Sequence, residues 1–275
     1  MSLPGVSAPA SPASPASPAP PASPASPARA IGALTGLELR LLARRGENVL
    51  ATIVIPVAVL LFFAGTSVIP LADHPVDFLL PGSIALAVIA AGLVNLGIAT
   101  GYDRAYGVLK RLGGSPLTRG GLIAAKIASV LVLETAQVVV LVAVAVLALG
   151  WAPGSAWSPA LVVLALLLGT VAFSGLGLLL AGTLRAEATL ALANGLFLGF
   201  LMLGGIILPV DHLPAFLQPV AAALPATALS DLLRIAFAAP MTAAAHAPSA
   251  VAPTAILIAW AVGACGLAAA RFRWD

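Results

Sequence analysis

The sequence predicts an all-α fold: a polytopic membrane protein with six transmembrane helices, an N-terminal interfacial helix and an outer re-entrant helical hairpin before the last span. Of its 275 residues, 61% are hydrophobic and only 8% are charged, with a mean hydropathy of +1.10. Soluble proteins carry about 25% charged residues, so this composition indicates a chain that lipid solvates. Six apolar runs reach the length of about 20 residues that a helix needs to cross a bilayer. These runs lack the period-two alternation of a transmembrane barrel, which argues against that class.

The first region, residues 1–33, is rich in alanine, serine and proline and is predicted to be disordered, because it offers almost no large apolar side chains to bury. Between Met1 and Ala28 there is neither a positive charge nor an apolar segment, so we expect no secretory signal there. A spacer is the favoured interpretation, and PxxP spacing leaves recruitment of a proline-reading domain as the alternative. Residues 34–275 form the second region, the predicted transmembrane domain.

An amphipathic segment precedes the first apolar run. Four leucines share one helical face and four charged residues occupy the others: Leu34, Leu37, Leu41 and Leu42 against Glu38, Arg40, Arg44 and Arg45. The pattern predicts a helix at the membrane surface, with its leucines among acyl chains and its arginines near anionic headgroups. The alternative is a simple extension of the first span.

The six apolar runs are the predicted spans. They cover residues 49–69, 79–100, 127–149, 160–183, 189–208 and 251–270. Each is predicted to be a helix because a backbone exposed to lipid must satisfy its own hydrogen bonds. Pro56 lies inside the first run and predicts a kink there.

The basic residues predict the topology. Of thirteen lysines and arginines, twelve lie on the cytoplasmic side if both termini are cytoplasmic, and only Arg234 falls outside. This asymmetry strongly favours both termini inside. It also accounts for the isoelectric point near 9.6, so we expect no nucleic-acid partner.

The third outer segment, residues 209–250, is about forty residues long and holds two moderately apolar stretches, 213–224 and 226–239. Each is too short or too polar to span, which predicts a pair of re-entrant or surface-lying helices. Asp231 and Arg234 are three residues apart on the second stretch and are expected to form a surface pair.

Two outer acid–histidine pairs, Asp73 with His74 and Asp211 with His212, raise the question of a metal site or a pH gate. Neither loop supplies the further ligands that would complete a site, and adjacent residues rarely chelate one ion. We therefore expect no metal site.

The cytoplasmic loop between the second and third runs contains a short amphipathic pattern, ended by Gly113 and Gly114. Its apolar positions are Tyr102, Tyr106, Leu109 and Leu112, and its charged positions are Asp103, Arg104, Lys110 and Arg111. A helix of this kind suits insertion into a groove on a soluble partner, where apolar anchors supply affinity and charges set the orientation. The alternative is a loop that binds headgroups and only fixes the topology.

Glu134 is the formal charge expected inside the membrane, deep within the third span. An acid at such a depth should face the protein interior, near Gln137 one turn further on. It is a candidate for the translocation path, and the alternative is a neutral acid hydrogen-bonded between helices.

Four further residues within the spans are candidates. Asn95 and Asn194 could line the path, although asparagines in spans more often join helices. Gly195 and Gly199 form a GxxxG pattern in the fifth span, which allows close helix approach at a dimer seam or within one chain.

In their order along the chain, these features resemble the permease subunit of ABC-2 type exporters, a family of bacterial drug, polyketide and polysaccharide export permeases that includes the daunorubicin-resistance permeases. The features that carry the resemblance are the basic amphipathic helix before the first span, the loop with Asp103, Arg104, Gly107, Ser115, Pro116 and Leu117, the end of the fifth span from Gly204 to Pro209, and the pairs Leu213 with Pro214, Leu224 with Pro225 and Leu233 with Arg234. Ala105 stands where the family often has a second acid.

The resemblance implies that Tyr102 to Pro116 would act as a coupling helix seated on a separate ABC-type ATP-binding subunit. That subunit would bind ATP and magnesium, and this chain would bind no cofactor. Two permease copies, as a homodimer or a heterodimer, would alternate between inward-facing and outward-facing states. The resemblance also favours the dimer-seam interpretation of Gly195 and Gly199, and it implies a bacterial plasma membrane location.

No phosphate-binding GxxxxGK[ST] motif occurs in the chain: Gly113 to Gly120 has the glycines but not the lysine followed by serine or threonine. The chain is therefore expected to be a permease and not an enzyme. We expect it to export a hydrophobic or amphipathic substrate, such as a drug, a lipid or a secreted metabolite. The alternatives are a proton-coupled secondary carrier that uses Glu134 and a membrane scaffold without transport.

Overall fold

The computed structural model describes residues 27–44, 46–65, 75–113, 118–238 and 249–271, and within these ranges all regular elements are helices. They are α1 (Pro27–Arg44), α2 (Gly46–Ala64), α3 (Pro75–Ile89), the π-helix η1 (Ala90–Asn95), α4 (Leu96–Ala105), α5 (Val108–Gly113), α6 (Arg119–Leu149), α7 (Pro159–Thr183), α8 (Ala186–Leu203), the 3-10 helix η2 (Val210–His212), α9 (Gln218–Ala222), α10 (Pro225–Ala236) and α11 (Val251–Arg271). The predicted all-α class is confirmed.

Five helices are long and apolar enough to cross a membrane. They are Pro75–Ala105, Gly120–Leu149, Pro159–Thr183, Ala186–Leu203 and Val251–Arg271. The first of these joins α3, η1 and α4 in one continuous helix. The first predicted span corresponds to α2, in which Ile53–Ala64 is a shorter apolar helix, and residues 66–69 at the end of that predicted span lie outside the described residues. The six-span count therefore stays a prediction.

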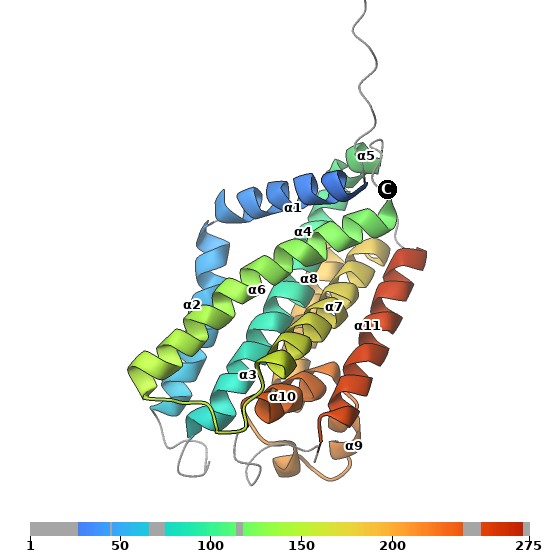
Figure 1. The fold of residues 1–275 in the computed structure, drawn as a ribbon. Helices are drawn as coiled ribbons and strands as arrows, with labels where there is room; N and C mark the ends of the chain where they lie inside the picture. Colours follow the sequence, from blue (N-terminus) through green and yellow to red (C-terminus); the bar gives the residue numbers. More distant parts are fainter. Residues whose placement is uncertain (1–26, 45, 66–74, 114–117, 239–248, 272–275) are drawn as a thin grey trace, which may run out of the picture.

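The helices are arranged with one crosswise element at each end (Figure 1). α1 lies across one end, beside the loop that contains α5, and α11 finishes at this same end. We call it the cytoplasmic end, following the charge distribution. The opposite end carries α9 and α10, and we call it the outer end. The long helices α3, α6, α7, α8 and α11 run between the two ends, and α2 lies beside α3 and α6.

The helix from α3 to α4 and its neighbour α7 form the centre of the fold, and α7 also packs along α11. The approach of α7 to η1 is very close: a Cβ at Gly177 would lie 2.5 Å from the carbonyl oxygen of Gly92. Small residues at such a crossing let two backbones touch, which is how helices associate in a membrane.

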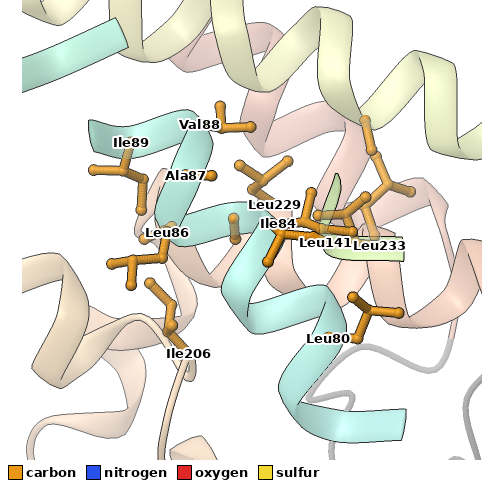
Figure 2. Close-up of a cluster of buried hydrophobic side chains, with 14 of the residues drawn as sticks. Leu80, Ile84, Leu86, Ala87, Val88, Ile89, Leu141, Ile206, Leu229 and Leu233 are labelled. Carbon is orange, nitrogen blue, oxygen red and sulfur yellow. The ribbon is translucent and has the colours of Figure 1, made fainter. Parts of the chain in front are cut away.

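The core extends to the outer end, where α10 packs against the spans. Figure 2 shows Leu80 and Ile84 of α3, Leu229 and Leu233 of α10, and Leu141 of α6 in one apolar cluster. α10 is thus an integral part of the helical core. The stretch before it, residues 213–224, forms only the short helix α9. Insertion of this hairpin into a membrane stays a prediction.

Candidate functional site

The predicted amphipathic helix of the cytoplasmic loop is two helices in the structure. α4 continues the span to Ala105, and α5 begins at Val108. Between them Gly107 has a φ of +71°, a left-handed conformation that glycine adopts readily and that no α-helix contains. The prediction of one helix from Tyr102 to Leu112 was therefore wrong, because helical spacing alone did not reveal this turn.

The turn displays an apolar and basic surface at the end of the molecule where α1 lies. Tyr106 is 76% exposed, and Val108 and Lys110 are exposed beside it. The ring of Tyr102 stacks on that of Tyr106, with 6.0 Å between the ring centroids. We call Tyr102, Tyr106, Val108 and Lys110 the docking face. An exposed tyrosine that stacks on a half-buried one is a typical feature of protein interaction surfaces.

Leu109 points in the opposite direction. It is fully buried and packs with Leu34 of α1 and with Leu122 and Ala125 of α6. It anchors α5 to the rest of the chain and offers no surface to a partner. The side chains of Arg111 and Leu112, and all of Pro116, lie outside the described residues.

Asp103 and Arg104 also make contacts within the chain. The carboxylate oxygen Oδ2 of Asp103 accepts a hydrogen bond of 3.1 Å from Nζ of Lys126, which donates another of 2.7 Å to Oε1 of Glu38. Nη2 of Arg104 donates to the carbonyl oxygen of Leu184 at 2.6 Å. These two members of the predicted coupling segment thus connect its base to α1, α6 and the end of α7.

Sequence reasoning did not single out Lys126 or Glu38. One signal was available: Lys126 is the last cation before the third span. A lysine at such a boundary indicates topology and does not by itself indicate a buried ion pair. Lys126 is a buried ion-pair partner because α1 lies across α6. The spacing of residues in the sequence does not reveal that crossing.

Inside the spans, Glu134 is buried on α6, and its described hydrogen-bond partner is Thr170 of α7. The hydroxyl of Thr170 also lies 2.6 Å from the carbonyl oxygen of Leu166, an acceptor that can only receive a hydrogen. A hydroxyl has a single hydrogen to donate. The single hydrogen is accounted for when Thr170 donates to Leu166 and a protonated Glu134 donates to Thr170, whereas the second carboxyl oxygen, Oε1 of Glu134, is buried without a described hydrogen bond.

The other candidates within the spans are dispersed. Gln137 is buried on α6, and Asn95 is half-buried at the end of η1. Asn194 is exposed on α8, and its amide donates to the carbonyl oxygen of Leu190 in the same helix at 2.9 Å. At both Gly195 and Gly199, an added Cβ would meet nothing within 4 Å. The GxxxG pattern therefore faces open space in the single chain.

At the outer end, the expected surface pair of Asp231 and Arg234 is buried, with side-chain exposures of only 4% and 2%. The surface prediction was wrong because α10 packs against α3 and α7 and turns these charges inward. Nη1 of Arg234 lies 3.2 Å from Oδ1 of Asp231, and its Nη2 donates to the carbonyl oxygen of Gly205. The guanidinium also lies 4.1 Å from the ring centroid of Phe78.

Burial lowers the pKa of Arg234 to about 10, and the neighbouring carboxylate of Asp231 opposes the shift. The side chain therefore remains a cation at neutral pH. Gly205 has a φ of +63°, so the backbone turns where α8 has ended and directs a carbonyl toward the arginine. This arrangement joins α10, α3 and the segment after α8.

Among the described residues, no three histidine, cysteine, aspartate or glutamate side chains gather as metal ligands. Asp211 and His212 are exposed in η2. Asp73 and His74 lie outside the described residues.

The family model described as ABC-2 type transporter matches residues 29–238. The matched region runs from α1 past α10 and includes the docking face, Lys126, Glu134 and Arg234. No curated protein matches the chain significantly.

Proposed function

Because the chain belongs to the ABC-2 type transporter family and is a multi-pass membrane permease, we propose that it is the membrane subunit of an ATP-driven exporter. In this proposal both termini lie in the cytoplasm and the membrane is the bacterial plasma membrane. ATP and magnesium bind to a separate subunit, which docks at the cytoplasmic end. A second permease copy, identical or similar, completes the transporter.

The observation that carries the proposal is the docking face. Tyr106 is 76% exposed on a turn that Leu109 anchors to α1 and α6. A large aromatic side chain is suited to fill a pocket on a partner when it is exposed and the turn that carries it is packed against the rest of the chain. Lys110 beside it favours a partner surface with carboxylates at the rim of that pocket.

The composition of the spans supports an apolar cargo. Each of the five long helices contains an 18-residue window with no more than two charged residues. A path for a small hydrophilic ion would need more buried polar groups than such helices provide. We therefore propose a hydrophobic or amphipathic substrate, namely a drug, a lipid or a secreted metabolite.

The dimer seam is proposed along α8. Gly195 and Gly199 are one turn apart, and both leave room for a neighbouring helix that the single chain does not supply. Small residues at this spacing allow two helices to approach closely in lipid.

The rival function is a proton-coupled carrier in which Glu134 exchanges its proton during transport. The contacts of Glu134 favour a static role, because its carboxyl is hydrogen-bonded to Thr170 and so joins α6 to α7. Glu134→Gln keeps a donor of similar shape and removes the titration. Transport abolished by this variant would support the carrier, and transport retained would support the exporter.

The proposal is tested by purifying the full chain in mild detergent from its native membrane and measuring ATP hydrolysis in the co-purified fraction. Tyr106→Ala should reduce recovery of the ATPase by at least about tenfold, because an aromatic anchor contributes about 2 kcal/mol or more. Phe216→Ala is the matched control: Phe216 is also 76% exposed but lies at the outer end. An unmodified chain without ATPase, or equal recovery with both variants, would contradict the proposal.

A further inference from the structure

A buried ammonium group connects the base of the docking face to two other helices. Lys126 near the start of α6 is 1% exposed, while its partners Glu38 of α1 and Asp103 of α4 are 19% and 28% exposed. Its Nζ lies 2.7 Å from the Glu38 carboxylate and 3.1 Å from the Asp103 carboxylate. One cation thus holds three helices that approach the cytoplasmic end from different parts of the chain.

The charges make Lys126 the essential member of this cluster. Two carboxylates share one ammonium group, so removal of Lys126 leaves two negative charges facing each other. Like charges at short range repel, and the partly buried position weakens the screening by water. Without Lys126, α1 and α4 would lose their attraction and gain a repulsion.

The cluster lies directly beneath the docking face. Asp103 is three residues before Tyr106, in the last turn of α4. Arg104, the next residue, donates to the carbonyl oxygen of Leu184 just after α7. A displacement of the docking face therefore acts at once on an ion pair to α1 and α6 and on a hydrogen bond to the end of α7.

We propose that Lys126 is a positioning residue that transmits movement of the docking face to α1 and α6, while Asp103 and Arg104 are its connections to the docking segment. This inference rests on the proposed function, since it requires an ATP-binding subunit on the docking face. The docking face binds that subunit, and the Lys126 cluster converts its movement into a movement of the membrane helices.

The test measures movement separately from docking. Spin labels are placed at Arg40→Cys on α1 and Val163→Cys on α7, both exposed positions, in a Cys265→Ala background. The permease–ATPase complex is reconstituted in lipid nanodiscs, with labelled chains diluted by unlabelled ones. Pulsed electron paramagnetic resonance then gives the distance between the labels with and without ATP and vanadate.

In the unmodified complex, nucleotide should change the distance. In Lys126→Met the ATPase should remain docked, with an affinity within about twofold of the unmodified chain, and the nucleotide-dependent change should disappear. The triple variant Lys126→Glu, Glu38→Lys, Asp103→Lys reverses every charge of the cluster and should restore the change. Arg271→Met, which removes an exposed cation from the end of α11, is the matched control and should behave as unmodified.

Each other outcome overturns the inference. A distance that nucleotide leaves unchanged in the unmodified complex would show that α1 does not move with the docked subunit. A change that persists in Lys126→Met would show that another contact transmits the movement. Loss of docking in Lys126→Met would assign the cluster to docking. Failure of the unmodified chain to bind any ATPase is a different result, because it contradicts the proposed function itself.

Discussion

Among the described residues, each end of the molecule buries one cation, and the two ends hold it in different ways. At the cytoplasmic end, Lys126 is held by carboxylates from two other helices, which remain 19% and 28% exposed. At the outer end, Arg234 is held by Asp231 of its own helix and by the carbonyl oxygen of Gly205. The first arrangement joins separate elements through side chains that reach water. The second fixes the backbone turn at Gly205 against the buried helix α10.

The surroundings of the two cations show the same contrast, with more exposed structure near Lys126 and more buried structure near Arg234. The docking face projects from the cytoplasmic end, whereas α10 at the outer end is buried along most of its length. Trp151 extends the packing at the outer end. Its Nε1 donates a hydrogen bond of 2.8 Å to Oδ1 of Asp77. Its ring meets that of Phe237 edge-on, with 5.4 Å between the ring centroids. The comparison shows an outer cation enclosed by a packed core and a cytoplasmic cation whose ion-pair partners reach water.

The largest effect is expected at the outer cation. Arg234→Leu leaves Asp231 buried without its cation, and breaking a buried pair in this way costs about 3–5 kcal/mol. Denaturant unfolding of the purified chain in detergent should show this loss. Adding Asp231→Leu removes the orphaned charge and should recover part of it. An unchanged unfolding midpoint in the single variant would mean that the outer end is not held by this pair.

The packing of the two ends should also respond differently to one added methyl group. In Gly82→Ala the new Cβ would lie 2.3 Å from the carbonyl oxygen of Ile206, so the outer end must shift at a cost of about 1–3 kcal/mol. Gly32→Ala on α1 meets nothing within 4 Å and should stabilise its helix by about 0.5–1 kcal/mol. The same unfolding measurement compares them, and equal effects would remove the packing contrast between the ends.

The cytoplasmic ion pair should be weaker and sensitive to salt. Glu38→Gln removes one of the two carboxylates from Lys126 and should cost about 1 kcal/mol or less, because Glu38 is partly exposed. The difference from the unmodified chain should shrink when unfolding is measured in about 1 M salt, where the screening length is about 3 Å. A loss as large as that of Arg234→Leu, independent of salt, would make the two ends equivalent.

The smallest effect is expected between the two ends, at Glu134. Glu134→Gln keeps a group that can donate to Thr170, so the unfolding free energy should change by less than about 0.5 kcal/mol. This change is smaller than the cost of leaving a buried group without its hydrogen bond. Glu134→Asp retracts the carboxyl from Thr170 and should cost about 1–3 kcal/mol, the penalty for an unsatisfied buried group. A large loss in Glu134→Gln would show that the carboxyl is ionised.

Much of the fold follows from the sequence, and the candidate site follows in part. Tyr106, one of the four apolar positions of the amphipathic pattern, is exposed. Leu109 shares that pattern but is buried, because α1 lies across the cytoplasmic end and covers this side of α5. Gly107 ends the helix in the middle of the pattern, since periodicity does not report a positive φ.

The sequence by itself determined the helical class and the approximate limits of the long apolar helices. The physical reason is local: in lipid each helix must satisfy its own backbone, so length and hydropathy are sufficient information. The tertiary structure decided which polar side chains are buried and what they hold. Lys126 and Glu38 are 88 residues apart, and Arg234 and Gly205 are 29 apart. Such partners are chosen by the crossing of helices, because a buried charge is stable only where another element supplies its counterpart.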